Sequence, residues 1–475
     1  MLIGREREKE LLLDANSSDD SSFIAVYGRR RVGKTYLIRE TFGREITFQH
    51  SGLANGKMSQ QLKEFRNSLE LASQSEVKDF ADWSEAFMAL QKWIGSLPEG
   101  RKIIFIDELP WIDTPRSGFL GALEHFWNGW ASARKDITLI VCGSATSWII
   151  NNIINNHGGL HNRLTHRISL QQFSLYECRE YTRHYRLNMS DYQIMEAYMI
   201  LGGVPYYWSL LDRRYSLHQN IDLLFFGPKG TGLTDEFDRL YASLFKRPEP
   251  YVAIVEALST VRAGLTRDDI INKVGVKSGG ELSRYLKELE WCGFIRKYNN
   301  FAKASRQAVY QLIDCFTIFH AKFLKSQRHH NEHFWTDNLG SPTYRAWSGI
   351  SFETLCLLHV AQIKESLRIG GIAAEVYSWR QRGDEATGVA GAQIDLIIDR
   401  KDGVIDICEM KFSEDEYRLT SDEERKLRNR RAAFIEATKT RKAVRIVLVS
   451  PYGASRNLYS GIFSGEVTID GLFMK

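Results

Sequence analysis

The chain has 475 residues, of which 43 % are hydrophobic and 25 % charged, and its formal net charge is +5. This length is enough for about three domains with cores of their own. The composition is typical of a soluble protein, the first residues carry no apolar signal core, and no apolar run reaches the ~18 residues of a membrane-spanning helix. We therefore expect a cytoplasmic protein without a membrane anchor. The mild positive charge neither requires nor excludes nucleic acid as a partner.

The cysteines are scattered and form no C-x-x-C pair. Several follow apolar runs, which predicts buried thiols in a reducing compartment rather than disulfides or a thiolate zinc site. They are Cys142, Cys178, Cys292, Cys315, Cys356 and Cys408.

The first motif is a phosphate-binding loop. A glycine turn and a charged helix over residues 2–12 precede an apolar strand over residues 23–27, and the loop follows as Gly28, Arg29, Arg30, Arg31, Val32, Gly33, Lys34 and Thr35. This spacing lets the glycines curl successive backbone N–H groups into a nest for phosphate. Lys34 can reach the β and γ phosphates, Thr35 can offer its hydroxyl to Mg²⁺, and the next helix begins at the phosphates. The loop predicts binding of ATP or GTP.

A second acidic motif follows the next predicted strands. After a strand over residues 45–50 and helical sequence to residue 90, the apolar strand 102–106 ends in Asp107-Glu108. Asp107 would hold Mg²⁺ through water, and Glu108 would orient or deprotonate the attacking water. An Asp-Glu pair is weak evidence alone, but after a phosphate loop it predicts hydrolysis as well as binding.

Further candidates lie at the ends of later strands. Ser144 follows the strand 138–143 and can sense the γ-phosphate, with a simple turn serine as the alternative. Arg163 and Arg167 precede a fifth strand and can stabilise transition-state charge, with surface arginines as the alternative. His157, His161 and His166 lack metal-ligand spacing and are predicted to be loop residues. Alternating strands and helices predict a three-layer α/β domain with a mostly parallel sheet.

Helical, tyrosine-rich sequence over residues 175–211 ends in Gly202-Gly203-Val204-Pro205. This turn can place backbone beside the nucleotide, and an ordinary turn between helices fits the same residues.

At this point a family resemblance rests on particular residues. Gly4-Arg5-Glu6, residues 27–35, Asp107-Glu108, Gly143-Ser144 and Gly202–Pro205 together resemble the archaeal-type ATPase family, in the AAA-like, signal-transducing branch of phosphate-loop ATPases. The likeness covers roughly the first half of the chain. It implies an extra strand between the two nucleotide motifs and a helical lid that ends in the Gly-Gly-x-Pro turn. It also implies that Gly4 and Arg5 recognise adenine and that Pro205 lies at the nucleotide.

After a turn-rich connection at residues 226–232, the pattern predicts a winged helix. Helices at 251–258 and 265–271, the second with Thr266 as N-cap, precede a third helix opened by Ser278, and strands at 294–298 and 309–313 complete the fold. Outward Lys277, Arg284 and Lys287, with Lys303 and Arg306 in the wing, can contact DNA, although many winged helices dock only proteins. A strongly apolar helix follows at 316–324. In the next tract, His329, His330 and His333 are predicted to belong to a charged linker rather than a metal site.

A second chemical constellation lies near the end of the chain. Glu353 is one acid on an apolar helix, and Asp395 and Glu409 lie on two strands joined by the turn Asp402-Gly403. Antiparallel pairing can bring these acids together to hold Mg²⁺, and Lys411 points to the same face as Glu409. The alternative is an edge-strand salt bridge.

This region resembles the restriction-endonuclease-like, PD-(D/E)xK-type domain of unknown function that follows the ATPase in the same family. The resemblance rests on the winged helix, Tyr310–Asp314, Glu353, Asp395, Glu409 and Lys411, although the nominal proline is absent. Beyond it, Arg425, Lys426, Arg428, Arg430 and Arg431 share one helix, which can bind backbone phosphate or be a solvated helix with interspersed acids.

The sequence thus predicts an ATPase core at residues 1–170, a lid at 171–235, a winged helix at 236–325 and a nuclease-like domain at 340–475. Our leading hypothesis is an ATP-hydrolysing protein that acts on DNA through a Mg²⁺-dependent nuclease domain gated by nucleotide state. The alternatives are a nucleotide-switched DNA- or protein-binding regulator with an inactive nuclease-like domain, and a chaperone-like ATPase acting on protein. A homo-oligomer or a protein partner is compatible with each.

Overall fold

The computed structural model describes residues 2–155, 158–160, 162–227, 232–276, 279–301, 308–325, 331–381, 383 and 391–475. The chain divides into two compact units. Unit 1 consists of Met1–Gln172 with Ala242–Lys246, and unit 2 consists of Phe173–Tyr241 with Arg247–Lys475. The first boundary lies close to the predicted end of the ATPase core. The predicted lid and nuclease-like segments belong to unit 2, as does the predicted winged-helix segment except for Ala242–Lys246.

Unit 1 is built on a parallel sheet of five strands in the order β2-β3-β4-β1-β5. β1 leads into the phosphate loop and β3 ends in Asp107. β4 lies between them, in the place of the extra strand that the family resemblance implies. β1, β3 and β4 are buried along nearly their whole length, which is the pattern of a sheet covered on both faces. The strands are β1 (Ser22–Tyr27), β2 (Ile46–Ser51), β3 (Lys102–Asp107), β4 (Ile137–Gly143) and β5 (His166–Ser169).

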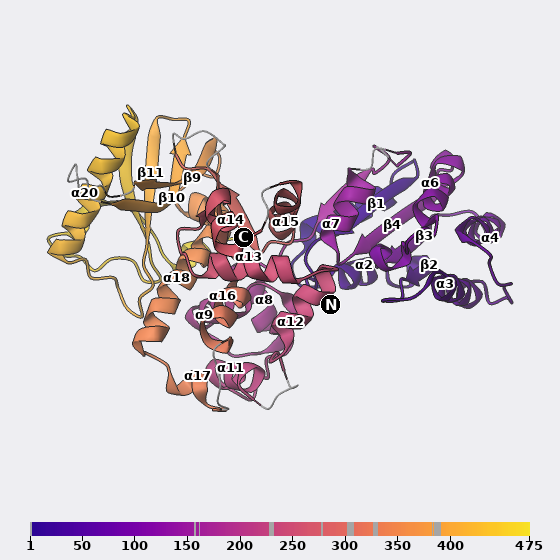
Figure 1. Ribbon diagram of the computed structural model, residues 1–475, viewed down its shortest axis with the longest axis horizontal. Coiled ribbons are helices and arrows are strands. Elements are labelled where there is room, and N and C mark those ends of the chain that lie inside the picture. Colours follow the sequence, from indigo (N-terminus) through magenta and orange to yellow (C-terminus); the bar gives the residue numbers. More distant parts are fainter. Residues whose placement is uncertain are drawn as a thin grey trace. The chain divides into compact units, whose positions relative to one another are not determined.

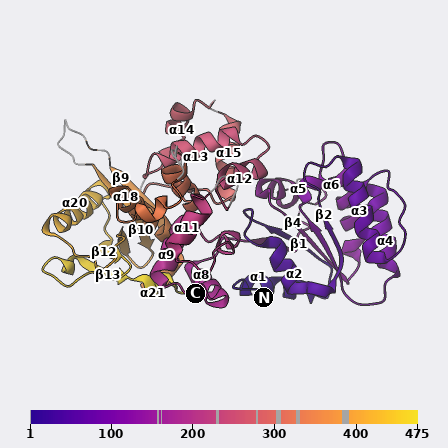
Figure 2. The same ribbon diagram turned by 90° about the horizontal axis from the view of Figure 1, so that it is seen from below.

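Helices cover both faces of this sheet, so unit 1 has three layers. Phe23 and Ala25 of β1 point into a core with α3, α4 and α6, whereas Ile24 and Val26 point into a second core with α1 and α2. Figure 2 shows α1 and α2 on one side of the strands and α3 and α4 on the other. The helices are α1 (Glu6–Asn16), α2 (Lys34–Phe42), α3 (Met58–Ser73), α4 (Trp83–Ser96), α5 (Leu109–Ile112), α6 (Phe119–Gly129) and α7 (Thr146–Ile149).

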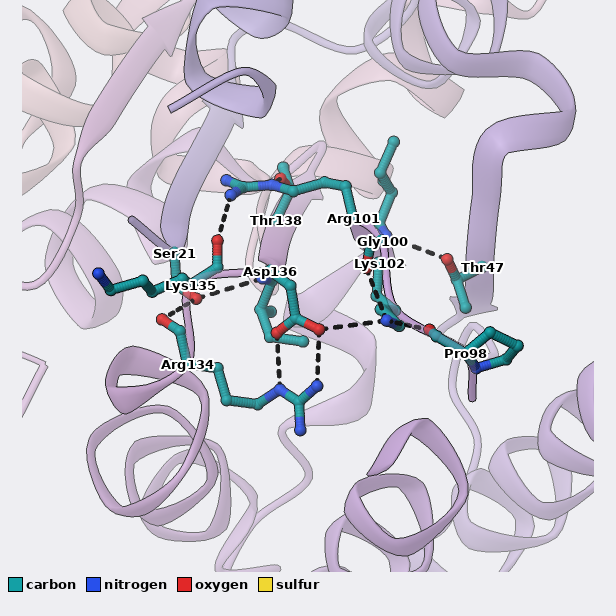
Figure 3. A network of polar contacts seen from close by, with 12 residues as sticks. Ser21, Thr47, Pro98, Gly100, Arg101, Lys102, Arg134, Lys135, Asp136 and Thr138 are labelled. Atoms are coloured by element: carbon teal, nitrogen blue, oxygen red, sulfur yellow. Dashed lines mark hydrogen bonds and ion pairs between the residues drawn. The ribbon is translucent and has the colours of Figure 1, made fainter. Parts of the chain in front are cut away.

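A polar network holds the amino ends of β3 and β4 (Figure 3). Arg101 donates to the carbonyl oxygens of Ala15, Ser18, Asp20 and Lys135 and to the hydroxyl of Thr138, at 2.7–3.1 Å. Lys102 and Arg134 both pair with Asp136, at 3.2 and 2.6 Å. This end of the sheet is opposite to the carboxyl ends of the strands, where the phosphate loop and Asp107 lie, so the network serves the fold.

Unit 2 begins with a helical segment. α8 (Leu175–Tyr185), α9 (Asp191–Leu201) and α11 (Leu217–Phe225) each start at a serine whose side chain accepts from the third backbone N–H of the helix, and each has the reciprocal bond of a capping box. α10 (Pro205–Trp208) and α12 (Glu236–Leu244) complete the segment, and the end of α12 from Ala242 onward is assigned to unit 1. Gly203 has no room for a side chain, because a Cβ there would lie 2.0 Å from the carbonyl oxygen of Phe173.

Three helices and a small antiparallel sheet follow in the predicted order. α13 (Glu249–Ser259), α14 (Arg267–Val274) and α15 (Gly280–Trp291) precede β7 (Ile295–Tyr298) and β8 (Val309–Leu312), and β6 (Leu265–Thr266) joins them in the order β6-β8-β7. Thr266 caps α14 as predicted. Ser278, Lys277, Lys303 and Arg306 lie outside the described residues.

The last part of unit 2 is a mixed five-stranded sheet in the order β13-β12-β11-β10-β9. Figure 1 shows β9, β10 and β11 of this sheet. β10 pairs antiparallel with β9 and β11, whereas β12 pairs in parallel with β11 and β13. Phe434 of α20 packs on Ile394, Ile397 and Ile407, and α18 contacts β11. The strands are β9 (Ala374–Gln381), β10 (Ala392–Arg400), β11 (Val404–Met410), β12 (Ala443–Val449) and β13 (Phe463–Val467), and the helices are α16 (Cys315–Phe319), α17 (Phe334–Asp337), α18 (Pro342–Leu358), α19 (Val360–Ser366), α20 (Ser421–Thr438) and α21 (Ile469–Leu472).

The cysteines and the lengths of the helices were also subjects of prediction. All six cysteines are buried thiols, as predicted. Among the described residues, no helix combines the length and the apolar character needed to cross a bilayer.

Candidate functional sites

The phosphate loop joins the end of β1 to the start of α2, and its glycines are required by geometry. Gly28 has φ 145°, and a Cβ there would lie 2.3 Å from the carbonyl oxygen of Leu170. Gly33 has φ 92° and directly precedes α2. Both conformations strongly favour glycine, which explains the spacing read from the sequence.

Lys34, Thr35 and Asp107 meet at this loop. The Nζ of Lys34 donates to the carbonyl oxygens of Gly28 and Arg29, at 2.9 and 3.0 Å, and its side chain is buried. The Thr35 hydroxyl donates to the Asp107 carboxylate at 2.7 Å. A hydroxyl and a carboxylate side by side are hard oxygen donors, so the residues present fit Mg²⁺ bound together with nucleotide phosphates.

Glu108 and Ser144 face each other across neighbouring strands. The Ser144 backbone N–H donates to the Glu108 carboxylate at 3.1 Å, and the Ser144 hydroxyl also contacts it. Glu108 has φ 52°, a left-handed conformation that is costly for a residue with a side chain and is often found at functional sites. The predicted sensor thus touches the predicted catalytic acid.

Cys142 is a neighbour of this site that the sequence reasoning did not single out. Its thiol contacts the Asp107 carboxylate from β4. Burial, and then the Asp107 charge, raise the pKa of the Cys142 thiol well above its usual range, so it stays protonated and can donate. The only sequence signal for Cys142 was its place near the end of an apolar strand.

Arg5 is buried rather than extended to solvent. Its Nη2 donates to the carbonyl oxygen of Gln171 at 2.7 Å and lies 3.5 Å from that of Val32 in the phosphate loop. Gly4 and Arg5 both have positive φ, 63° and 65°. The structure therefore brings the start of the chain to the nucleotide loop, while adenine recognition stays a prediction.

The other residues predicted to serve the nucleotide differ in exposure and in the unit to which they belong. Arg163 and Arg167 are exposed, and Pro205 begins α10 in unit 2. Within the loop, Arg29 is buried and Arg30 and Arg31 are half-buried. His157 and His161 lie outside the described residues, as do His329 and His330 of the histidine tract.

The second predicted constellation does come together within unit 2. Glu353 on α18, Asp395 on β10 and Glu409 on β11 form a group that we call the carboxylate cluster, and each side chain is only 12–17 % exposed. The pairing of Leu396 with Cys408, continued by one residue, sets Asp395 opposite Glu409. The Nζ of Lys411 lies 3.0 Å from Glu409, as the strand alternation predicts.

Cations from other elements already occupy the carboxylate cluster. Arg262, between α13 and β6, contacts Glu353 and lies 3.1 Å from Asp395. Arg430 on α20 contacts Glu409. Neither arginine was given this role by the sequence reasoning, because no local pattern tells which distant carboxylate an arginine will meet.

The mutual repulsion of the acids is visible in Glu353. Burial, and then the charge of Asp395, raise the pKa of Glu353 to about 8, against the lowering effect of Arg262. The charge of Glu409 is the smallest of the causes that contribute to this rise. Carboxylates this close resist ionisation unless cations are present, so the cluster is a place where positive charge is stabilised.

In the part of the chain that the structure describes, no three His, Cys, Asp or Glu side chains are arranged as a group that could hold a metal ion. The carboxylates are instead paired with arginine and lysine. Even so, the Arg262 guanidinium lies between Glu353 and Asp395, which shows that their oxygens can share one cation. One or two carboxylates are what Mg²⁺ takes from protein when substrate phosphates supply other ligands, so the donor set fits that ion.

An open cleft of about 710 Å³ adjoins the carboxylate cluster. It is bordered by Ala263, Gly264, Tyr298, Trp379, Arg380 and Asp395, and therefore lies between the β6–β8 sheet and the edge of the larger sheet. Elsewhere on the three-helix segment, Arg284 and Lys287 of α15 are exposed, as predicted.

Comparison with known proteins adds to this geometry. Residues 2–211 match a protein family described as an ATPase domain predominantly from Archaea. The first part of the chain is thus similar to ATPase domains of archaeal type. The uncharacterised protein MJECL04 of Methanocaldococcus jannaschii is 23 % identical over 403 residues, which cover 82 % of this chain and 84 % of that protein.

Solved structures are more distant. The Walker-type ATPase PABY2304 of Pyrococcus abyssi is 16 % identical, covers 67 % of this chain and 96 % of its own, and has a TM-score of 0.47. The Aeropyrum pernix ORC2 protein, in a structure of its ADPNP–ADP complexes, is 13 % identical, covers 67 % and 93 %, and has a TM-score of 0.43.

Proposed function

We propose that this protein is an ATPase that acts on DNA, and that its second unit carries a Mg²⁺-dependent nuclease site gated by nucleotide state. The similarity of residues 2–211 to an archaeal ATPase domain supports the first part of this proposal. The observation that carries the nuclease is the convergence of Glu353, Asp395, Glu409 and Lys411 from a helix and two strands at one sheet end.

The nucleotide chemistry follows from the loop. Lys34, now bonded to loop carbonyls, would turn to the β and γ phosphates of ATP. Thr35 and Asp107 would hold Mg²⁺, which neutralises phosphate charge when bound. Glu108 would orient or deprotonate the attacking water, and its contact with Ser144 gives it a defined position before ATP arrives.

At the second site, Asp395 and Glu409 would hold Mg²⁺, with Glu353 adding a further carboxylate. Bound there, the ion would stabilise the negative charge that develops on a phosphodiester and lower the pKa of an attacking water. Lys411 would position that water and steady the phosphate, because its ammonium group already lies beside Glu409. We assign no role in the chemistry to the buried thiols.

DNA is the partner we favour for unit 2. The three-helix segment with its small sheet has the element order of a winged helix, and Arg284 and Lys287 are exposed on α15, the helix that would enter the major groove. Arg425 and Arg428 on α20 pair with acids of their own helix, which favours the solvated-helix interpretation there.

A second candidate is a nucleotide-switched regulator whose nuclease-like domain is inactive. The pairing of all three acids of the carboxylate cluster with cations favours it, because such pairing would also be found in a site that no longer binds metal. This candidate predicts DNA binding without cleavage.

The deciding experiment incubates the full-length protein with Mg²⁺ and ATP on linear, circular and branched DNA. We expect cleavage that is lost in Asp395→Ala and Lys411→Ala. Glu108→Gln should bind ATP but hydrolyse it at least ~100-fold more slowly, because general-base catalysis contributes factors of that order. If Glu108→Gln changes cleavage in the presence of ATP, nucleotide state gates the nuclease. If the DNA stays intact under every condition, the nuclease proposal is wrong and the regulator becomes the favoured function.

A further inference from the structure

Arg262 links two segments that are far apart in the sequence. Its Nη2 contacts a carboxylate oxygen of Glu353, 91 residues away, and lies 3.1 Å from one of Asp395, 133 residues away. We call these two ion pairs the Arg262 bridge. It connects the three-helix segment to the predicted metal ligands.

The backbone around Arg262 is held in place. Gln311 of β8 donates to the Arg262 carbonyl oxygen at 2.9 Å, and the Tyr298 hydroxyl donates to the next carbonyl, that of Ala263, at 2.6 Å. Gly264 has φ 73°, and a Cβ there would lie 2.4 Å from the Tyr310 carbonyl oxygen. The small sheet thus presents Arg262 to the carboxylate cluster from a fixed base.

The Arg262 side chain is more accessible to solvent than the two acids that it contacts. The Arg262 side chain is 47 % exposed, whereas its two partners are 12 % and 17 % exposed. The cleft described above begins at Ala263 and Gly264, the residues after Arg262, and reaches Asp395. An arginine fork binds carboxylate and phosphate with the same geometry, so a phosphate in this cleft would compete with the carboxylates for it.

We propose that Arg262 is an exchangeable cation of the nuclease site, which holds Glu353 and Asp395 in the absence of metal and moves to a DNA phosphate when a divalent metal takes the carboxylates. The inference rests on the proposed nuclease function and names how that site is regulated and a residue that meets its substrate. Metal and the Arg262 bridge exclude each other at the same oxygens, whereas metal and DNA support each other.

Two measurements on the full-length protein test this proposal. Arg262→Ala should strengthen metal binding in the first and weaken DNA binding in the second. In the first, Mn²⁺ alone is titrated without DNA or nucleotide, and binding that disappears in Asp395→Ala is assigned to the carboxylate cluster. Arg262→Ala should bind this Mn²⁺ about 10-fold more tightly, a change equivalent to ~1.4 kcal/mol, because the competing cation is gone. Arg262→Lys keeps the positive charge but loses the forked guanidinium, so its Mn²⁺ affinity should lie between those of the wild type and Arg262→Ala. Arg380→Ala, an exposed cleft arginine without a contact to the cluster, should match the wild type.

In the second measurement, binding of a duplex oligonucleotide is followed in Ca²⁺, which supports binding while cleavage is avoided. Here Arg262→Ala should bind more weakly, by several-fold, because the phosphate contact is lost. Equal unfolding temperatures of the variants and the wild type would confirm that the fold is kept.

The outcomes separate the two proposals. Mn²⁺ binding that depends on Asp395 but is equal or weaker in Arg262→Ala would contradict the exchange of Arg262 for metal. It would not contradict the proposed nuclease site. Unchanged DNA affinity would likewise contradict the phosphate contact. If no variant shows Mn²⁺ binding that depends on Asp395, both the exchange and the metal site are wrong.

Discussion

At the scale of single residues, Glu108 shows how the fold holds a predicted catalytic acid in a costly conformation. Its left-handed backbone costs about 1–2 kcal/mol in an ordinary residue. The buried strand β3 before it and the bonds from Ser144 hold it there. The carboxylate is therefore positioned by the scaffold rather than by a nucleotide.

His359 gives a prediction for pH at the same scale. Its Nδ1–H donates to the Leu355 carbonyl oxygen at 2.8 Å, and its Nε2 accepts from the Leu175 N–H at 3.0 Å, so the bonds need the neutral ring. Burial lowers the pKa of His359 to about 4, from 6.5. Because the unfolded chain takes up the proton first, the stability that the neutral ring contributes is complete above pH 6.5. Between that pH and about pH 4 it falls by ~1.4 kcal/mol for each drop of one pH unit.

Chemical unfolding of the wild type and of His359→Gln between pH 8 and pH 4.5 tests this. The amide can supply both bonds without titrating, so the variant should lose less stability on acidification. His50 and His320, whose pKa values burial also lowers to about 4, are present in both proteins and cancel in the comparison. Parallel pH profiles for the two proteins would contradict the prediction.

At the scale of elements, Arg101 ties the turn after α1 to the amino ends of β3 and β4. Figure 3 shows Arg101 near Thr138 of β4. Replacing Arg101 with Leu leaves several carbonyl oxygens without their donor. We expect a loss of about 2–3 kcal/mol in the free energy of unfolding of unit 1, since charged hydrogen bonds contribute ~1.5–3 kcal/mol each and do not add fully.

The matched control is Arg134→Leu. Arg134 belongs to the same network, but it pairs with a single carboxylate near the surface. Pairs of this kind are worth ~0–1 kcal/mol. Urea denaturation of both variants measures the contrast, and equal losses would show that Arg101 is not the central residue of the network.

At the scale of the whole molecule, the two proposed sites draw their side chains from different units and share no residue. ATP with Mg²⁺ at about 100 times its Kd should therefore stabilise unit 1 by ~2.7 kcal/mol, because ligand that binds only the folded state shifts unfolding by mass action. In scanning calorimetry we expect the transition of unit 1 to rise in temperature. Lys34→Ala should abolish the rise, and Asp395→Ala should keep it in full. A rise that disappears in Asp395→Ala would mean that ATP binding depends on the carboxylate cluster, which contradicts two separate sites.

Much of this architecture was readable in the sequence, because the signals were local. Gly28, Gly33 and Lys34 are fixed in spacing by the turn they form, and Asp107 follows a buried strand on the same edge of the sheet. The hairpin at Asp402-Gly403 likewise set the register that pairs Asp395 with Glu409. The helices at residues 175–211, the three-helix segment and the strands β9 to β12 follow from periodicity and turn residues, although their grouping into one unit does not.

The sequence by itself determined the phosphate loop, the acidic pair and the strands that carry the carboxylates, because each depends on residues near one another in the chain. Only the tertiary structure decided what surrounds them. The Ser144 contact to Glu108, the Cys142 thiol on Asp107, the burial of Arg5 and the Arg262 bridge all join segments with no common local pattern. Exposed arginines have many equivalent acids within reach in an unfolded chain, and only packing selects one. For this reason the state of the carboxylate cluster, paired with arginine rather than open, could be learned from the fold alone.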